Sequence, residues 1–93
     1  MMEGHASISA DILSRYAADA AREVAGVRGL TGRRPARISE SGGRVTVEVH
    51  LDVEWGASIP ELGREVQERV RSYLERMTEL DLAAVNVVVD EIG

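Results

Sequence analysis

The chain has 93 residues, which is long enough for one domain with a modest core and too short for two. It contains no cysteine, which excludes disulfides, cysteine metal sites and cysteine nucleophiles, and its net charge of −5 argues against a general nucleic-acid binder. The hydrophobic fraction of 44% is ordinary for a soluble protein, and no apolar run approaches the ~20 residues that a membrane span requires. No charged leader followed by an apolar segment opens the chain, so we expect a cytoplasmic protein that does not insert into the membrane itself.

The charged residues are distributed unevenly. All eleven basic residues are arginine, and six of them stand between residues 22 and 44, against two acidic residues. Residues 45–93 reverse this balance, with four arginines against eleven acidic residues. The use of arginine alone is mainly interpreted as codon bias of a GC-rich genome, and secondarily as selection for bidentate contacts with anions.

Residues 1–7 show no periodicity and are expected to form a flexible N-terminus. A helix is predicted from Ile8 to about Ala25, because apolar residues recur there every three or four positions. Ser7 or Ser9 is suited to cap its start. The side expected to be buried consists of Ile8, Ile12, Leu13, Tyr16, Ala17, Ala20, Val24 and Val27.

Residues 26–35 form the least regular part of the chain and indicate a loop. The candidates for facing an anion or an acidic partner surface are the arginines of this loop and its flank, Arg28, Arg33, Arg34 and Arg37. Gly26 to Gly29 also have the spacing of the GxxG loop with which KH domains clamp a nucleic-acid backbone. A KH loop lies between two helices, whereas this segment leads from a helix toward a strand, so a helix-ending glycine and a turn are the simpler interpretation.

A short strand is predicted at residues 36–40 and a long one at residues 45–55. Gly42 and Gly43 join the two in a hairpin, because glycine readily adopts the positive φ of tight turns. Apolar and polar residues alternate along the whole long strand, so one side is expected to be buried and the other exposed. The inward residues are Val45, Val47, Val49, Leu51, Val53 and Trp55, with Trp55 closing the core at the sheet edge.

A second helix is predicted to begin after Ser58, which forms a capping-box pattern with Glu61. Its apolar side consists of Ile59, Leu62, Val66, Val70, Tyr73, Leu74 and Met77. A last strand follows at residues 82–90. Its predicted inward residues are Ala83, Val85, Val87 and Val89.

The element order α-β-β-α-β predicts an α+β domain over residues 8–93. We expect a two-layer sandwich, with two helices on one face of a three-stranded mixed sheet, in an order similar to that of type II KH domains. The connection through the second helix favours a parallel pairing of the last two strands, with the long strand in the centre. An all-antiparallel sheet with the last strand beside the first is the competing arrangement.

The chain offers little catalytic or metal chemistry. His50 stands between Glu48 and Asp52 on the outward side of the long strand, but each carboxylate is roughly 7 Å away along the strand at ~3.3 Å per residue. No Ser-His-Asp arrangement is indicated around the one histidine of the folded part, and no phosphate-binding glycine loop is present. We therefore predict a non-enzymatic protein with no catalytic residue, metal or cofactor.

Several segments together resemble a known family. They are Glu23 to Leu30 at the end of the first helix, Gly43 to Val49, Val53 to Glu61, Val66 to Glu68, and Met77 to Val87. The most specific part is a strand followed by Trp-Gly, Ile-Pro and a helix that carries Val-Gln-Glu. In these segments the chain resembles the alkaline shock protein family of envelope stress response proteins.

The resemblance implies a non-enzymatic adaptor or scaffold in the cytosol of a Gram-positive bacterium, linked to cell-envelope stress. The best-known members of the family collect at the membrane through a membrane-anchored member of the same family, and some self-associate. The implied partners are therefore a membrane-anchored relative or a second copy, and any membrane association would be through such a partner. The alternative from another class is a KH-like RNA-binding module.

The face of the sheet that the helices leave open is where we expect a partner to bind. The long strand places Thr46, Glu48, His50 and Asp52 there, and the last strand is predicted to add apolar residues. The predicted interface consists of Leu82, Ala84, Val88 and His50, and the arginine loop is the next candidate.

Overall fold

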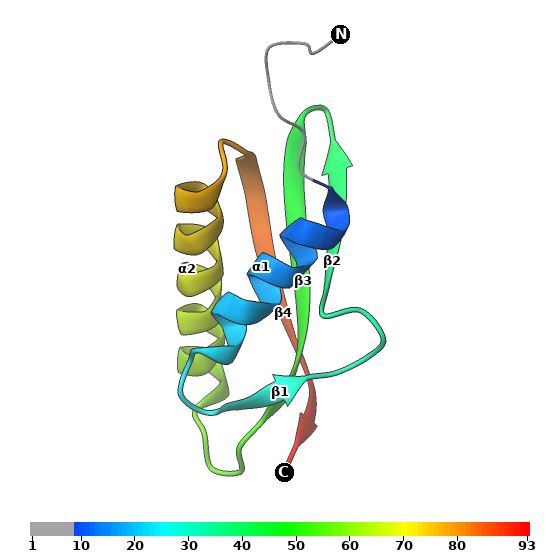
Figure 1. The fold of residues 1–93 in the computed structure, drawn as a ribbon. Coiled ribbons are helices and arrows are strands. Elements are labelled where there is room, and N and C mark those ends of the chain that lie inside the picture. The colour runs from blue at the N-terminus through cyan, green and yellow to red at the C-terminus, as the bar shows by residue number, and fades with distance from the viewer. Residues whose placement is uncertain (1–8) are drawn as a thin grey trace, which may run out of the picture.

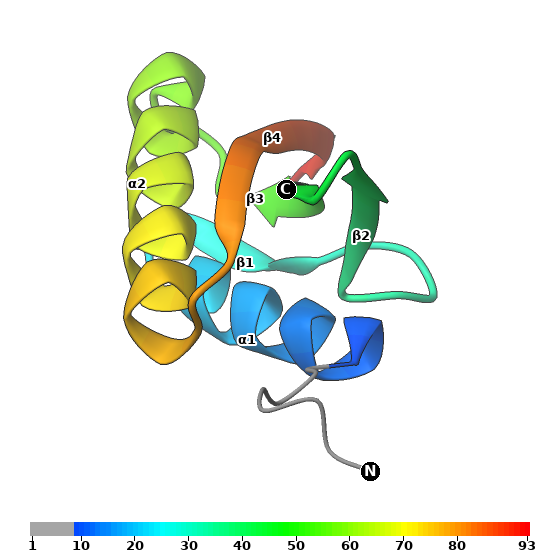
Figure 2. The same cartoon turned by 90° about the horizontal axis from the view of Figure 1, so that it is seen from above.

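The computed structural model describes residues 9–93, so the predicted flexible segment 1–7 lies outside it. The elements are α1 (Ala10–Arg22), β1 (Val27–Leu30), β2 (Ala36–Ser41), β3 (Arg44–Val53), α2 (Ile59–Met77) and β4 (Asp81–Ile92). Figures 1 and 2 show both helices on one side of a single sheet, with α1 against β1, β2 and β3, and α2 against β4. The predicted α+β two-layer sandwich is confirmed.

The sheet has four strands instead of the predicted three, because part of the expected loop is a strand. After α1, Gly26 adopts a φ of +98° and turns the chain back toward the end of β3. Val27 then pairs with Val53, and Leu30 with Leu51, in an irregular antiparallel register. Four residues that include a glycine and an arginine show no strand periodicity, which is why the sequence pattern indicated a loop.

β3 is the central strand, as predicted. β2 runs antiparallel to its first part, from Ser41 opposite Arg44 to Ala36 opposite Val49. β1 pairs with the last residues of β3 along the same edge, and β4 runs parallel to β3 along the other edge. The mixed sheet is therefore confirmed, and the all-antiparallel alternative is wrong. The hairpin between β2 and β3 turns at Gly42 and Gly43, which both have positive φ, as expected.

The inward side of β3 forms the middle of the core. Its five apolar residues are at most 5% exposed, and they pack against small and aliphatic side chains of both helices. Three residues of the predicted helix stripes are exposed instead: Ile12, Ile59 and Met77. Each of them lies in the first or last turn of its helix.

Two irregularities in β4 change which residues face inward. Val45 pairs with Leu82 but the next residue of β3 pairs with Ala84, so Ala83 is an extra residue in β4. Leu82 therefore points inward like Val45 and is buried, which makes the predicted outward position of Leu82 wrong. A second extra residue, Asp90, shifts the register again near the end of the strand.

Trp55 does not close the core. β3 ends at Val53, and Trp55 lies in the turn that follows, where Gly56 has a φ of +89°. The Trp55 side chain is consequently 84% exposed. The alternation of the sequence continued two residues beyond the end of the strand, and the prediction of a buried tryptophan is wrong.

The two helix starts differ from each other. Ser9 caps α1 as expected, since its side chain accepts a hydrogen bond from the Ile12 N–H at 3.2 Å. Ser58 stands at the corresponding position of α2, but its side chain makes no capping hydrogen bond. The predicted capping box therefore does not form. Pro60 removes one of the free N–H groups in this first turn, and the Leu62 N–H donates to the backbone oxygen of Ser58 at 2.8 Å.

Candidate functional site

The outer face of the sheet, which neither helix covers, holds a connected polar cluster around His50. The Nε2 atom of His50 lies 2.5 Å from Oε2 of Glu48, and its Nδ1 atom lies 2.7 Å from Oδ2 of Asp90. The Thr31 hydroxyl donates to the same oxygen of Asp90 at 2.7 Å, and the Thr31 N–H donates to the His50 backbone oxygen at 3.0 Å. The cluster thus joins β3, the end of β4 and the loop after β1.

Because both ring nitrogens face carboxylates, the doubly protonated imidazolium is the form that can donate to both. The hydrogen bonds to Glu48 and then to Asp90 accordingly raise the pKa of His50 above its ordinary value of 6.5. The hydrogen bond from Thr31 and then that from His50 lower the pKa of Asp90 below 3.8. When the ring is protonated, the cluster is an ion pair that joins β3 to the end of β4.

The sequence predicted an exposed His50 with carboxylates beyond its reach, and this was only partly right. Glu48, two residues away on the same strand, does reach the ring, whereas Asp52 does not contact it. Thr31 and Asp90 were missed, because contacts between segments distant in the sequence leave no signal in the alternation of one strand. No group of residues among 9–93 has the arrangement to hold a metal ion.

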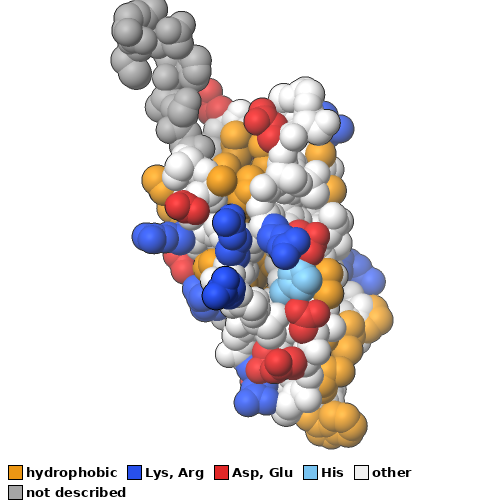
Figure 3. All heavy atoms as spheres, turned by 90° about the vertical axis from the view of Figure 1, so that its right-hand side faces the viewer, with side chains coloured by type: hydrophobic (Ala, Val, Ile, Leu, Met, Phe, Trp, Pro, Cys, Tyr) orange, Lys and Arg blue, Asp and Glu red, His pale blue; other side chains and the backbone are white. Residues whose placement is uncertain are grey.

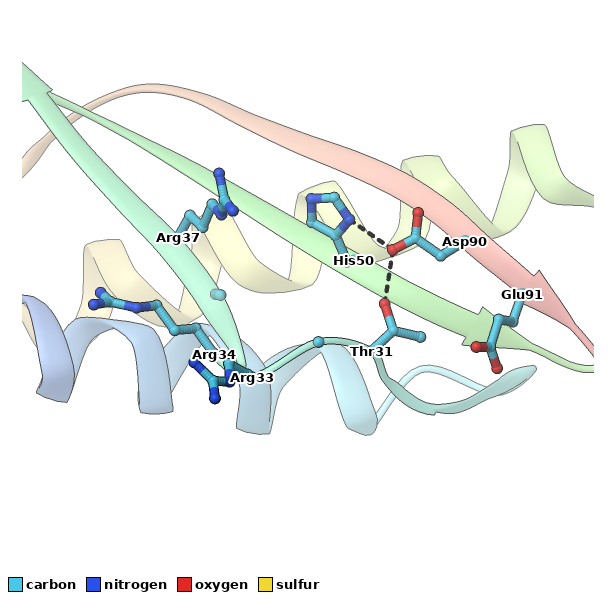
Figure 4. Close-up of a pocket in the computed structure, with 9 residues that line it drawn as sticks. Thr31, Arg33, Arg34, Arg37, His50, Asp90 and Glu91 are labelled. Atoms are coloured by element: carbon cyan, nitrogen blue, oxygen red, sulfur yellow. Dashed lines mark hydrogen bonds and ion pairs between the residues drawn. The ribbon is translucent and has the colours of Figure 1, made fainter.

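An open hollow of about 440 Å³ lies beside this cluster. Figure 4 shows Arg33, Arg34 and Arg37 toward one end, Asp90 and Glu91 toward the other, and His50 between them. The structure thus brings the predicted arginine loop and the predicted face residue His50 into one site. Figure 3 shows the basic side chains gathered around the histidine.

Three of the four predicted arginines line this hollow, and Arg34 also lines two neighbouring hollows. Within residues 9–93, neither Arg33, Arg34 nor Arg37 has a carboxylate within ion-pair distance. The fourth, Arg28, lies on β1 with its guanidinium against Gly93 and belongs to another part of the surface. The end of the hollow with three arginines is a basic area on an acidic protein.

The apolar residues of the predicted interface are separated by the fold. Ala84 and Val88 lie on the outer face, in register with Thr46 and His50, and are half-buried. Leu82 is in the core. The predicted interface is therefore reduced to Ala84, Val88 and His50.

The outer face also carries unbalanced negative charge near the end of β3. Asp52 stands opposite Glu91 in the parallel register, which places two carboxylates side by side. The Oδ1 atom of Asp52 is buried and has no hydrogen-bond partner within the described chain.

The GxxG segment does not form the loop that a KH domain uses. Gly26 makes the turn after α1, and Gly29 lies inside β1, opposite Asp52. The segment therefore lies between a helix and a strand, as the simpler interpretation of the sequence had it.

Comparison with known proteins adds a family to this geometry. Residues 36–93, which include β2, β3, α2 and β4, match the alkaline shock protein 23 family, which is described as having a cell envelope-related function. The chain belongs to this family. The resemblance predicted from the sequence segments is thus confirmed, and with it a function related to the cell envelope.

The chain is also similar to YqhY of Bacillus subtilis (strain 168), which is described as an uncharacterized protein. The alignment of the two sequences extends over 99 residues at 29% identity, and it covers 90% of this chain and 73% of YqhY. None of the helices in residues 9–93 is long and apolar enough to cross a membrane.

Among solved structures, the fold is similar to that of MamM-CTD. One MamM-CTD variant has a TM-score of 0.69 at 19% identity, covering 87% of this chain and 92% of that one. A cadmium form of another variant has a TM-score of 0.62 at 18% identity, covering 89% of this chain and 98% of that one. At this level of identity the similarity shows a common fold and nothing about ligands.

Proposed function

We propose that this member of the alkaline shock protein 23 family is a non-enzymatic adaptor that acts at the cell envelope by binding another protein through the outer face of its sheet. The observation that supports this is the uncovered face itself. It presents the half-buried Ala84 and Val88 in one row beside the His50 cluster and the arginine-lined hollow. Apolar residues next to unpaired charged groups are typical of the centre and rim of a protein interface.

The chemistry of the face supports binding more than catalysis. Both nitrogens of His50 are held by carboxylates, and the Thr31 hydroxyl donates to Asp90 and not to the ring. A general base needs a free nitrogen directed at a nucleophile. Partners of the kind that the family resemblance implies are a membrane-anchored relative or a second copy of this chain, in the cytosol.

The test is Val88→Arg, which replaces an apolar residue of the outer face with a charged one. Because Val88 is only half-buried, we expect the thermal transition to stay nearly unchanged, while capture of the partner from membrane and soluble fractions is lost. Ser72→Arg, at an exposed position of α2, is the matched control and should capture as the parent does.

Undiminished capture by Val88→Arg would show that the outer face is not the interface. Filter binding of single-stranded RNA at two salt concentrations tests the KH-like alternative. Phosphate contacts weaken steeply as salt rises, so RNA binding with a steep salt dependence would contradict the adaptor proposal.

A further inference from the structure

Trp55 is the most exposed large apolar residue of the described chain. Its side chain is 84% exposed. A second exposed apolar residue is Ile92, which pairs with Val53, two residues before Trp55, and is 50% exposed. The chain contains no other tryptophan. Tryptophan is strongly enriched among the residues that dominate binding energy at protein interfaces, so its full exposure here points to a contact.

The backbone around Trp55 is held on both sides. The Trp55 N–H donates to the Gly93 oxygen at 2.7 Å, and the Gly93 N–H donates to the Val53 oxygen at 2.9 Å. The Glu54 N–H donates to the Gly26 oxygen at 2.8 Å. The indole is therefore presented from a fixed turn, which reduces the entropy lost when it binds.

The surroundings of Trp55 are acidic. Trp55 lines a shallow hollow of about 360 Å³ together with Glu54, Glu61 and Glu65. No arginine lines this hollow. We call Trp55 with these three glutamates the Trp55 end.

The hollow beside His50 is basic at its arginine end, whereas the Trp55 end is acidic. Its volume of about 440 Å³ leaves room for an indole, and Arg33, Arg34 and Arg37 stand at its edge without ion-pair partners among the described residues. Guanidinium groups stack favourably on the face of an indole and form ion pairs with carboxylates. The acidic Trp55 end and the arginine end of this hollow are thus complementary in charge.

We propose that the Trp55 end of one copy docks into the arginine-lined hollow of a second copy, with its glutamates facing the arginines. This inference rests on the proposed function, because the hollow belongs to the outer face, and it names the occupant of that face. The two contacting surfaces are different, so the contact is heterologous. Each copy then has one free surface of each kind, and repeated contacts build a chain or a ring.

The single tryptophan makes the test direct. As the concentration of the parent protein rises, we expect its tryptophan emission to shift to shorter wavelength and its quenching by acrylamide to fall, while the sedimenting mass increases. Added salt should reverse both changes, because the ion pairs are exposed.

Two single variants should each remove the association. Trp55→Ala removes the docking side chain, and Arg34→Glu reverses a charge at the hollow, so we expect each to weaken self-association about tenfold or more. The matched controls are Ile12→Ala, another exposed apolar residue, and Arg76→Glu, another exposed arginine, which should associate as the parent does. All four positions are exposed, so the thermal transitions should stay near that of the parent.

Mixing the two defective variants tests whether the contact joins two different surfaces. The Trp55→Ala protein retains an intact hollow and the Arg34→Glu protein retains an intact Trp55, so together they should form a complex of two copies and nothing larger. The emission of the one tryptophan in that complex should shift to shorter wavelength.

Three results would overturn the proposal. They are a parent protein that stays monomeric with an exposed tryptophan, a mixture of variants that does not associate, and an emission shift produced by lipid vesicles in place of self-association. If any of these occurs while Val88→Arg still abolishes partner capture, the adaptor function stands and only the occupant is wrong.

Discussion

At the scale of single residues, His50 is the residue of the outer face that connects the most segments of the polar cluster. The groups that face it are Glu48 on β3, Asp90 on β4 and Thr31 in the loop, and Arg37 on β2 lines the same hollow. A neutral imidazole has one N–H, so loss of the proton leaves one carboxylate without its donor. The cluster that joins three segments of the chain is therefore sensitive to pH.

The first prediction concerns this pH dependence. The pKa of His50 is raised above 6.5, so the stability it contributes is complete below pH 6.5 and is lost as the pH rises through the folded-state value. Asp90 has a lowered pKa, so its contribution is present above 3.8 and is lost as the pH falls through the folded-state value. An NMR titration of the His50 ring should give a pKa above 6.5, and Asp90→Asn should bring it closer to 6.5.

Glu91→Gln is the control for this titration, because Glu91 lines the hollow without contacting the ring. A His50 pKa at or below 6.5 in the parent protein would mean that the imidazole does not bind both carboxylates in solution.

Ser14 supports a second prediction at this scale. It is buried in α1, where its hydroxyl donates to the Ala36 oxygen at 2.7 Å and accepts from the Ala36 N–H at 3.0 Å. Ser14→Ala would leave both backbone groups of Ala36 unsatisfied at the start of β2, so we expect it to cost ~1–3 kcal/mol of unfolding free energy. Ser39→Ala, at an exposed position of β2, should change the free energy by less than ~0.5 kcal/mol in the same denaturant titration. Equal effects would show that the Ser14 bonds do not form.

At the scale of elements, the two helix starts predict different costs. Ser9 accepts a hydrogen bond at the start of α1, so Ser9→Ala should cost ~0.5–2 kcal/mol. Ser58 accepts none at the start of α2, so Ser58→Ala should cost clearly less in the same urea unfolding series. A larger loss from Ser58→Ala than from Ser9→Ala would show that the capping box forms in solution after all.

The extra residue in β4 supports another prediction. It turns Leu82 into the core, where the side chain is 6% exposed, while Val88 stays on the outer face. Leu82→Ala should therefore cost ~2–5 kcal/mol, as for a buried leucine, and Val88→Ala less than about 1 kcal/mol. A regular strand without the extra residue would place both residues outward, and the two variants would then unfold alike.

At the scale of the whole molecule, β3 holds the sheet together. It pairs with β1 and β2 along one edge and with β4 along the other, and its inward residues pack against both helices. We expect the amides of Val47 and Val49 to exchange with solvent most slowly, and those of Val27 and Leu30 in the short β1 to exchange faster. Hydrogen exchange followed by NMR measures this order. Equal protection of β1 and β3 would contradict it.

Much of this molecule was determined by the sequence alone. The two helices, β2, β3 and β4 and the inward side of β3 were predicted correctly, because a period of 2.0 or 3.6 residues records which side of an element meets the core. The hairpin followed from its two glycines, and the mixed sheet from the preferred hand of the connection through α2. The family could also be recognised from short segments such as Val53 to Glu61. These features depend on residues that are close together in the sequence, so the sequence shows them directly.

Only the tertiary structure decided the rest. β1 exists because the end of β3 offers it backbone partners, and Leu82 is buried because one extra residue reverses its direction. Trp55 is exposed because the strand ends before it, and His50 meets Asp90 only when segments 40 residues apart lie side by side. A single-residue shift reverses every later side chain of a strand, and pairing between distant segments has no period of its own, so neither could be predicted from the pattern of residues.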